Sequence, residues 1–305
     1  MPKVLCLLYH RVIPYEKDAY QIKVKPETFD NHIKFLSENY PIIKFDDDWS
    51  DIKEDSIVVT FDDGYMDNYL YAYPILKKYQ VPATIFVTSG NIGTNREFWW
   101  DDLLRLCVCR KTKWKAFKLC DDLLNYTWQT ETEDQCLDMA LSLRYILRRE
   151  DNIQIFSSFF SQLKEWSGLN DDGREENYSM SKKQIIEMSE SQLITIGGHT
   201  INHFSLGCLS LERQKRECKQ SICDIEQIIN RKIGVFSYPF GGRQDYTNDT
   251  INILRNSGIE KAATTENRCY IQGDDNFTIP RISMKDISLN SFKTEISKRF
   301  NDATG

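Results

Sequence analysis

The segment Val58-Val59-Thr60-Phe61-Asp62-Asp63-Gly64 places two adjacent carboxylates directly after an apolar, β-branched run. The run predicts a buried strand over residues 56–61. Barrel enzymes carry their catalytic groups in the loops beyond the carboxyl ends of such strands, so Asp62 and Asp63 are candidate functional residues. Side chains of neighbouring residues that leave a strand point in different directions, so one carboxylate can ligate a cation while the other accepts a proton. A helix N-cap is the ordinary alternative for an aspartate here, and Gly64 permits the tight turn.

The rest of the chain alternates between apolar, strand-like runs and segments with helical period. This alternation is typical of βα units around a parallel sheet or barrel, so the expected fold class is α/β. The expected strands are 4–9, 56–61, 83–88, 193–196, 235–238, 261–265 and 277–280. The expected helices are 27–40, 66–79, 181–189, 211–230, 247–257 and 289–300.

The pattern changes between about residues 101 and 178. This stretch is polar and charged, with helical spacing and no convincing strand. We expect one catalytic domain over residues 1–305 that carries a helical insertion at this point. A flexible lid is the alternative for the same stretch.

Composition narrows the classes of partner and compartment. The formal net charge of -6 and the pI near 5.4 argue against nucleic acid as the main partner, since phosphate binding needs concentrated Lys and Arg. No stretch reaches the roughly 18 consecutive apolar residues of a transmembrane segment. The apolar run 4–9 is too short for a signal peptide, and the nine cysteines are an odd number without a CxxC pair. These features predict a cytoplasmic protein with reduced thiols and leave the oligomeric state open.

A second polar cluster follows the expected strand 193–196. Its sequence is Gly197-Gly198-His199-Thr200-Ile201-Asn202-His203, and it holds two of the four histidines in the chain. Two histidines four residues apart can converge on one cation if the chain turns helically. A lone histidine is usually structural, but this spacing favours a metal site. One Asp and two His ligands would leave positions for water and substrate, as catalytic metal sites do.

Four motifs carry a resemblance to a known family. Thr60-Phe61-Asp62-Asp63-Gly64 and His199-Thr200-Ile201-Asn202-His203 resemble the first two motifs of the NodB-homology polysaccharide deacetylases, carbohydrate esterase family four. Ser237-Tyr238-Pro239-Phe240-Gly241 is similar to the third motif. Tyr9-His10-Arg11-Val12 resembles the opening YHxV motif of the branch that deacetylates poly-N-acetylglucosamine. The resemblance implies a distorted (β/α) barrel, which agrees with the alternation of expected strands and helices.

The resemblance also implies roles for individual residues. It implies that Asp63, His199 and His203 bind a divalent metal ion and that Asp62 is the general base. Such an ion lowers the pKa of a bound water to about 7 and polarises the amide carbonyl. Zn²⁺ suits these borderline ligands best, and Co²⁺, Ni²⁺ or Fe²⁺ would also fit. By analogy with the family, the backbone N–H of Phe240 would help to stabilise the oxyanion.

Two features of the family are missing from this chain. Many members have an Arg at the first position of the third motif, where it contacts the base, and this chain has Ser237 there. Many also use a late histidine as general acid, yet no histidine follows His203. We therefore expect His10, on the same barrel rim, to supply the proton to the leaving amine, with a structural loop histidine as the alternative. Arg281 follows the last expected strand, and we expect it to pair with Asp62 in place of the missing Arg.

Aromatic residues near the motifs are candidates for substrate binding. Indole rings make good platforms for the apolar faces of sugars, and we expect one of Trp99 and Trp100 to line the pocket. Tyr65, Tyr238 and Phe240 lie within or beside the motifs and are further candidates, although packing is the ordinary role of aromatic residues at a barrel rim.

Three classes of function remain open. The first is metal-dependent hydrolysis of an N-acetyl group from an amino sugar, with a cytoplasmic nucleotide-linked or lipid-linked intermediate of surface polysaccharide assembly as the expected substrate. The second is removal of an N-formyl group, or another amidohydrolase reaction on a related scaffold. The third is a non-catalytic carbohydrate-binding protein, against which Asp62 argues, because binding alone would not require a free carboxylate beside the ligands.

Overall fold

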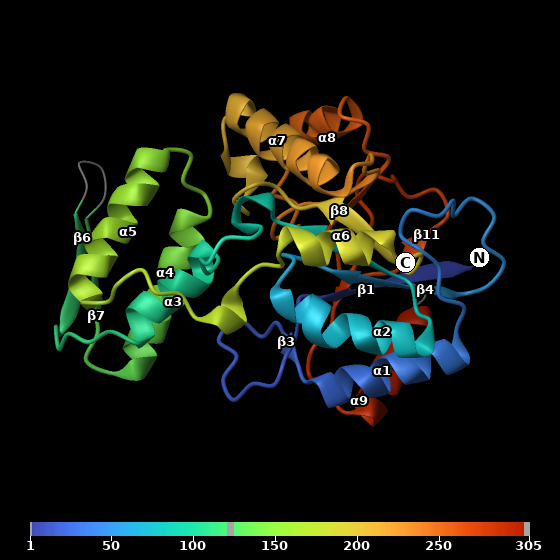
Figure 1. The fold of residues 1–305 in the computed structure, drawn as a ribbon, viewed down its shortest axis with the longest axis horizontal. Coiled ribbons are helices and arrows are strands. Elements are labelled where there is room, and N and C mark those ends of the chain that lie inside the picture. The colour runs from blue at the N-terminus through green and yellow to red at the C-terminus, as the bar shows by residue number, and fades with distance from the viewer. Residues whose placement is uncertain (1, 121–124, 302–305) are drawn as a thin grey trace.

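A curled β-sheet forms the centre of the computed structural model, which describes residues 2–120 and 125–301 (Figure 1). The strand order is β10-β9-β8-β5-β4-β1-β11, and β12 pairs with β1 on the same sheet. The neighbours from β10 to β1 are parallel, and β11 is antiparallel to β1. The strands are β1 (Lys3–Tyr9), β4 (Ser56–Phe61), β5 (Ala83–Val87), β8 (Ile194–Gly198), β9 (Val235–Ser237), β10 (Lys261–Ala263), β11 (Tyr270–Ile271) and β12 (Ile282–Ser283). This half-barrel sheet confirms the predicted α/β fold class.

Helices pack on the outside of the sheet, close to the expected ranges. In Figure 1, α1, α2 and α9 lie on one side of the sheet and α6, α7 and α8 on the other. Their bounds are α1 (Pro26–Asn39), α2 (Tyr73–Tyr79), α6 (Lys182–Glu190), α7 (Leu211–Ile229), α8 (Asn248–Arg255) and α9 (Leu289–Asn301). The helix expected over 66–79 begins differently, because a π-helical turn (Asn68–Ala72) precedes α2 and Pro74, which has no N–H, stands at the junction. A small parallel ladder joins β2 (Arg11–Val12) to β3 (Lys23–Val24).

Strand alternation explains which residues of β4 reach the barrel interior. Ile57, Val59 and Phe61 belong to the large apolar cluster that includes side chains of the surrounding helices. Val58 belongs instead to a separate interior cluster. Because successive side chains point to opposite faces, Asp62 continues the interior face of the strand. A parallel sheet that is buried on both faces accounts for the continuous apolar run in the sequence.

The prediction of a strand at Phe277–Pro280 is wrong. Ile279 forms only an isolated bridge with Ala263, and the regular strand is β12, two residues farther on. Pro280 has no N–H to give to a ladder, so pairing is interrupted there. The segment nevertheless links the two ends of the parallel sheet, because Ile279 pairs with β10 and Ile282 pairs with Leu7 of β1.

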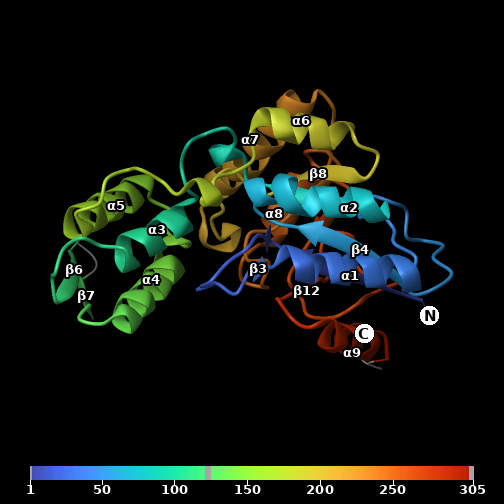
Figure 2. The same cartoon turned by 60° about the horizontal axis from the view of Figure 1, so that its bottom comes forward.

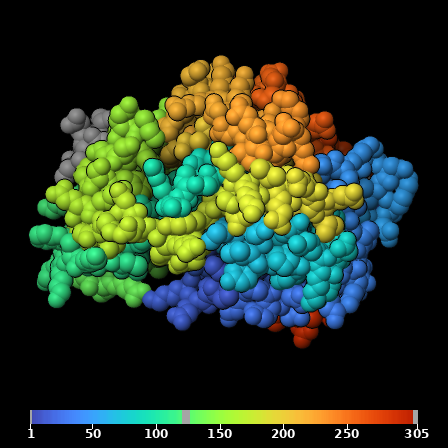
Figure 3. Space-filling model, viewed as in Figure 1, coloured from blue at the N-terminus to red at the C-terminus, as the bar shows by residue number. Residues whose placement is uncertain are grey.

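The insertion forms a lobe beside the barrel, as both ribbon views show (Figures 1 and 2). It contains α3 (Trp99–Val108), β6 (Ala116–Cys120), β7 (Asn125–Gln129), α4 (Glu133–Leu147) and α5 (Ile153–Ser167). Its buried apolar side chains form a cluster of their own. In the space-filling view the green insertion abuts the yellow and teal segments of the barrel (Figure 3).

The expectation that this stretch contains no strand is wrong. The strands β6 and β7 form an antiparallel hairpin. In β6, Phe117 and Leu119 are buried and Lys118 between them is exposed, which is the alternation of a half-buried strand. The alternation is short and lies among charged residues, so helical period dominated the sequence pattern. None of the helices in the described ranges is long and apolar enough to cross a membrane.

Candidate active site

Three potential metal ligands converge at the carboxyl ends of two strands. Asp63 follows β4 and His199 follows β8, while His203 lies four residues farther on. Their ligand atoms all lie within 4.8 Å of one another. Asp63 Oδ1 is 3.5 Å from His199 Nε2 and 3.3 Å from His203 Nε2. His199 Nδ1 lies 2.7 Å from the carbonyl oxygen of Ser237, which can only accept, so Nδ1 carries a proton and Nε2 is the nitrogen that faces Asp63.

The ligand atoms fit a divalent cation. Asp63 Oδ1 and His199 Nε2 are buried, and neither has a hydrogen-bond partner in the part of the chain that the structure describes. Unpaired buried polar atoms are costly and rare, so atoms that face one another in this way are suited to a shared ion. Burial raises the pKa of Asp63, but His199 and His203 outweigh it and leave that pKa below its usual range. Burial lowers the pKa of His203 to about 3, so both groups have their metal-binding protonation state at neutral pH.

The backbone around the ligands is unusual. Asp63 and His203 have φ angles of 74° and 58°, in the left-handed region where residues other than glycine are uncommon. Such conformations cost on the order of 1–3 kcal/mol each and are typical of functional sites. The helical turn expected between His199 and His203 is absent, because Thr200 is also left-handed, with a φ of 62°. The two imidazoles therefore converge through a strained loop.

Glu217 of α7 holds this loop and was missed by the sequence analysis. Its carboxylate accepts hydrogen bonds from the backbone N–H of Ile201 (3.1 Å), the backbone N–H of Asn202 (2.9 Å) and the Asn202 side-chain amide (2.7 Å). Glu217 is buried. A buried carboxylate inside an amphipathic helix is the only signal in the sequence, and it does not say which loop the carboxylate would contact.

Asp62 lies in a compact polar cluster next to the ligands. Arg281 donates from Nη1 to Asp62 Oδ1 and from Nη2 to Asp62 Oδ2, both at 2.7 Å. Ser237 Oγ donates to Asp62 Oδ2 at 3.2 Å and accepts from Arg281 Nη2 at 2.7 Å. Burial raises the pKa of Asp62, but Arg281 and then His199 outweigh it, so the net pKa lies below its usual range. The expected pairing of Arg281 with Asp62 is present, and Ser237 stands beside it.

These groups border a cavity of about 400 Å³. Asp62, Asp63 and His203 line it, and so does His10, which follows β1. Burial lowers the pKa of His10, although Asp63 and Asp62 oppose this shift. His10 is therefore mainly neutral at pH 7 and can act as an acid only after it has taken up a proton.

Comparison with known proteins agrees with this geometry. The family model described as polysaccharide deacetylase matches residues 50–116 and 161–262, which include Asp62-Asp63-Gly64 and the segment from His199 to His203. The chain belongs to the polysaccharide deacetylase family. YxkH of Bacillus subtilis (strain 168), named after the same family, is 22% identical over 271 residues and 87% of this chain. The chain spans about 65% of the length of that relative.

Solved structures share the fold of this polysaccharide deacetylase family member. BC0361, a polysaccharide deacetylase from Bacillus cereus, has a TM-score of 0.61 at 18% identity, over 96% of this chain and 69% of its own. The Streptococcus pyogenes deacetylase PplD, solved in complex with acetate, has a TM-score of 0.59 at 19% identity, over 96% of this chain and 98% of its own. IcaB from Ammonifex degensii has a TM-score of 0.59 at 18% identity, over 97% of each chain.

Two of the aromatic candidates line the cavity of this deacetylase family member, namely Trp100 and Phe240. The Phe240 backbone is left-handed, with a φ of 63°, and its N–H has no hydrogen-bond partner among the described residues. This amide is therefore available to a ligand.

The other three aromatic candidates do not line the cavity, and the hydroxyls of the two tyrosines that were expected to contact sugar bond within the protein. Tyr65 is fully buried and donates to Asp101 at 2.6 Å. Tyr238 is fully buried and donates to the carbonyl of Phe277 at 3.0 Å. Trp99 donates to the carbonyl of Asn202 at 2.9 Å and packs under the ligand loop. Each hydroxyl or indole N–H is therefore used within the protein.

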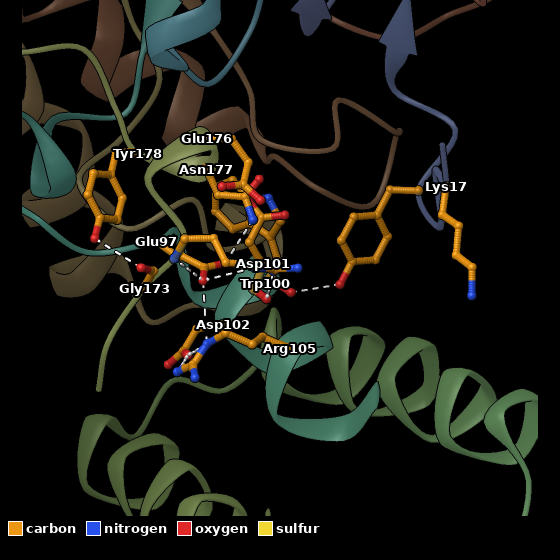
Figure 4. A network of polar contacts seen from close by, with 12 residues as sticks. Lys17, Glu97, Trp100, Asp101, Asp102, Arg105, Gly173, Glu176, Asn177 and Tyr178 are labelled. Atoms are coloured by element: carbon orange, nitrogen blue, oxygen red, sulfur yellow. Dashed lines mark hydrogen bonds and ion pairs between the residues drawn. The ribbon is translucent and has the colours of Figure 1, made fainter. Parts of the chain in front are cut away.

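A buried polar network holds the base of the insertion and positions Trp100 (Figure 4). Glu97 accepts from Arg174 Nη2 at 2.7 Å and from Asn177 Nδ2 at 2.9 Å, so it joins the segment before α3 to the segment after α5. Burial raises the pKa of Asp101, the neighbour of Trp100, to about 6. Trp100 Nε1 donates to the Tyr65 hydroxyl at 2.7 Å, and that hydroxyl donates to Asp101, so these bonds position the Trp100 ring.

Proposed function

We propose that this protein is a metal-dependent hydrolase that removes an N-acetyl group from an amino sugar. The observation that carries the proposal is the convergence of ligand atoms of Asp63, His199 and His203 within 4.8 Å of one another. Asp63 Oδ1 and His199 Nε2 have no hydrogen-bond partner among the described residues, and the ionised carboxylate of Asp62 lies beside them. Family membership supports carbohydrate de-N-acetylation as the reaction class. Zn²⁺ is the proposed ion, and Co²⁺, Ni²⁺ or Fe²⁺ would fit the same ligands.

A bound divalent cation would supply acidity to a water molecule and polarise the acetamido carbonyl. Asp62 accepts the proton of the attacking water. Because Arg281 binds both carboxylate oxygens, Asp62 remains ionised in a buried position and can take this role at neutral pH. Arg281 is thus a positioning residue that acts through Asp62.

Two further groups of the chain serve the later part of the reaction. The free N–H of Phe240 supports the negative charge that develops on the acetamido oxygen. The leaving amine receives the proton that Asp62 has taken, either directly or through His10. A relay through His10 is compatible with its lowered pKa, since the imidazole is neutral before it receives the proton.

We further propose that the substrate is a nucleotide-linked or lipid-linked intermediate of surface polysaccharide assembly and that the protein acts in the cytoplasm. The scattered cysteines support that location, because Cys6, Cys107 and Cys218 are buried free thiols suited to a reducing compartment. Cell fractionation with a tagged protein would test it, and recovery outside the cytoplasm would contradict it.

The direct test measures acetate and formate release from a panel of N-acylated amino sugars, with and without added Zn²⁺. We expect acetate release that a chelator abolishes and that added metal restores. Formate release alone would establish the N-deformylase alternative. Binding of sugar without release of either acid would support the non-catalytic alternative.

A further inference from the structure

Two arginines of the insertion reach the candidate active site. Arg144 and Arg148 stand one turn apart at the carboxyl end of α4, and both line the cavity that holds Asp62 and His203. The Nε atoms of Arg144, Arg148 and the adjacent Arg149 are buried and have no hydrogen-bond partner in the described part of the chain. Buried donors without acceptors are costly, and guanidinium groups are strong donors for anions.

Beside Asp62 and Asp63, one further carboxylate of the cavity, that of Asp245, lies near these arginines. Arg148 Nη2 lies 3.7 Å from Asp245 Oδ1, which already accepts from Ser205 Oγ at 2.7 Å. Burial lowers the pKa of Arg148, Asp245 opposes this shift, and Arg149 and Arg144 add like-charge repulsion. Arginines often stabilise the carboxyl end of a helix by interaction with its dipole, but such side chains are ordinarily hydrated. Buried Nε atoms without a hydrogen-bond partner beside the cavity therefore favour an anionic ligand over hydration.

The arginines are held at a fixed distance from the proposed metal ligands. The Arg148 guanidinium lies 4.3 Å from the ring centroid of Phe240, whose ring lies 4.7 Å from that of His203. One aromatic ring therefore separates the positive cluster from the ligands. The backbone N–H of Ser205 donates to the Arg148 carbonyl at 2.8 Å, so the end of α4 is attached to the loop that follows His203.

We infer that Arg144 and Arg148 bind a phosphate group that the amino-sugar substrate carries close to its N-acyl group. This inference rests on the proposed function and specifies its substrate class. Guanidinium groups bind phosphate with two parallel hydrogen bonds, and two arginines match a group that offers several acceptor oxygens. The separation of one ring suits a sugar whose acylated nitrogen and phosphate stand on neighbouring carbons. A neutral polysaccharide would leave the buried Nε atoms of both arginines without an acceptor.

The test compares the wild-type metal-loaded protein with R144Q, R148Q and the control R231Q. Arg231 is exposed and precedes β9, at the opposite end of the sheet from the site, and its substitution removes the same charge. The substrates are N-acetylglucosamine 1-phosphate, its uncharged methyl glycoside and the corresponding epimers. We expect wild type and R231Q to prefer the phosphorylated sugar. Each site substitution should reduce that preference by about 10- to 100-fold in kcat/KM, the effect of losing a hydrogen bond to a charged group.

Phosphate binding can also be measured directly, whichever amino sugar the protein deacylates. Calorimetry with inorganic phosphate should show weaker binding to R144Q and R148Q than to wild type or R231Q. Equal phosphate binding by all four proteins would overturn the inference, as would equal use of the phosphorylated sugar and the uncharged glycoside. If no amino sugar is deacylated at all, the proposed function fails, while the phosphate measurement still decides the arginine site.

Two more substrates identify the source of the phosphate. Faster turnover of a nucleoside-diphosphate-linked sugar would support a soluble carrier. Faster turnover of a sugar linked to a short isoprenoid phosphate would support a lipid carrier. Both results support the phosphate site, whereas turnover of either compound that is unchanged in the double variant R144Q/R148Q would contradict it.

Discussion

Replacement of Arg281 by Gln should weaken both the base and the fold. The substitution removes two 2.7 Å contacts to Asp62, one to each carboxylate oxygen, while the carboxylate stays buried. Burial alone raises the pKa of Asp62, and Arg281 is the main group that opposes it. The pKa of Asp62 should therefore rise in Arg281→Gln, and the acidic limb of the pH profile of kcat/KM should move to higher pH.

The size of the stability effect follows from the kind of ion pair. Removal of one partner of a buried pair costs about 3–5 kcal/mol, because it leaves an uncompensated charge. In the wild type, the lowered pKa of Asp62 stabilises the fold at pH values above the unfolded-state pKa of about 3.9. This contribution is lost as the pH falls through the folded-state pKa. The difference in unfolding free energy between the two proteins should therefore be largest near pH 7 and narrow as the pH falls and Asp62 protonates.

Urea unfolding and kcat/KM, each measured between pH 4 and pH 8, test this reasoning together. Arg268→Gln is the matched control, since Arg268 also donates to both oxygens of a carboxylate, that of Asp274, at a partly exposed position. A pair of that kind contributes about 0–1 kcal/mol. Arg281→Gln with an unshifted acidic limb and a loss of stability no larger than that of Arg268→Gln would refute the role assigned to Arg281.

Three further predictions concern the proposed metal site and proton transfer. His203→Gln should lose bound zinc, whereas His10→Gln should keep it. Plasma mass spectrometry of the purified proteins measures the zinc content, and equal zinc in both variants would contradict the ligand assignment. His10→Gln should lower kcat by about 10²–10⁴-fold if the imidazole relays the proton, and near-normal turnover across the pH range would exclude the relay. Glu217→Gln should weaken zinc affinity about 10- to 100-fold, because it loosens the ligand loop, and the exposed control Glu212→Gln should not; a competitive chelator titration measures both.

The sequence pattern predicted most of the parallel sheet because the signal is local. Strand β4 was predicted with the bounds that the structure has, since a strand buried on both faces is a continuous apolar run. The sequence pattern missed the hairpin of β6 and β7 and the strand β12, because their local signal is weak. Their alternation is short, and pairing with distant residues decides whether such a segment becomes a strand.

The sequence by itself determined the proposed ligands Asp63, His199 and His203 and the neighbouring Asp62, because adjacent carboxylates and spaced histidines keep their pattern along the chain. The sequence suggested Arg281 as a partner of Asp62, but the two-point geometry of that pair and the contact with Ser237 come from the tertiary structure alone. Arg281 meets Asp62 across 219 residues, and Ser237 meets it across 175. The closure of the sheet through the segment around Ile279 brings Arg281 into the interior, and docking of α4 brings Arg144 and Arg148 to the cavity. Contacts between residues so far apart in the sequence depend on the packing of whole helices and strands, which no local pattern of residues specifies.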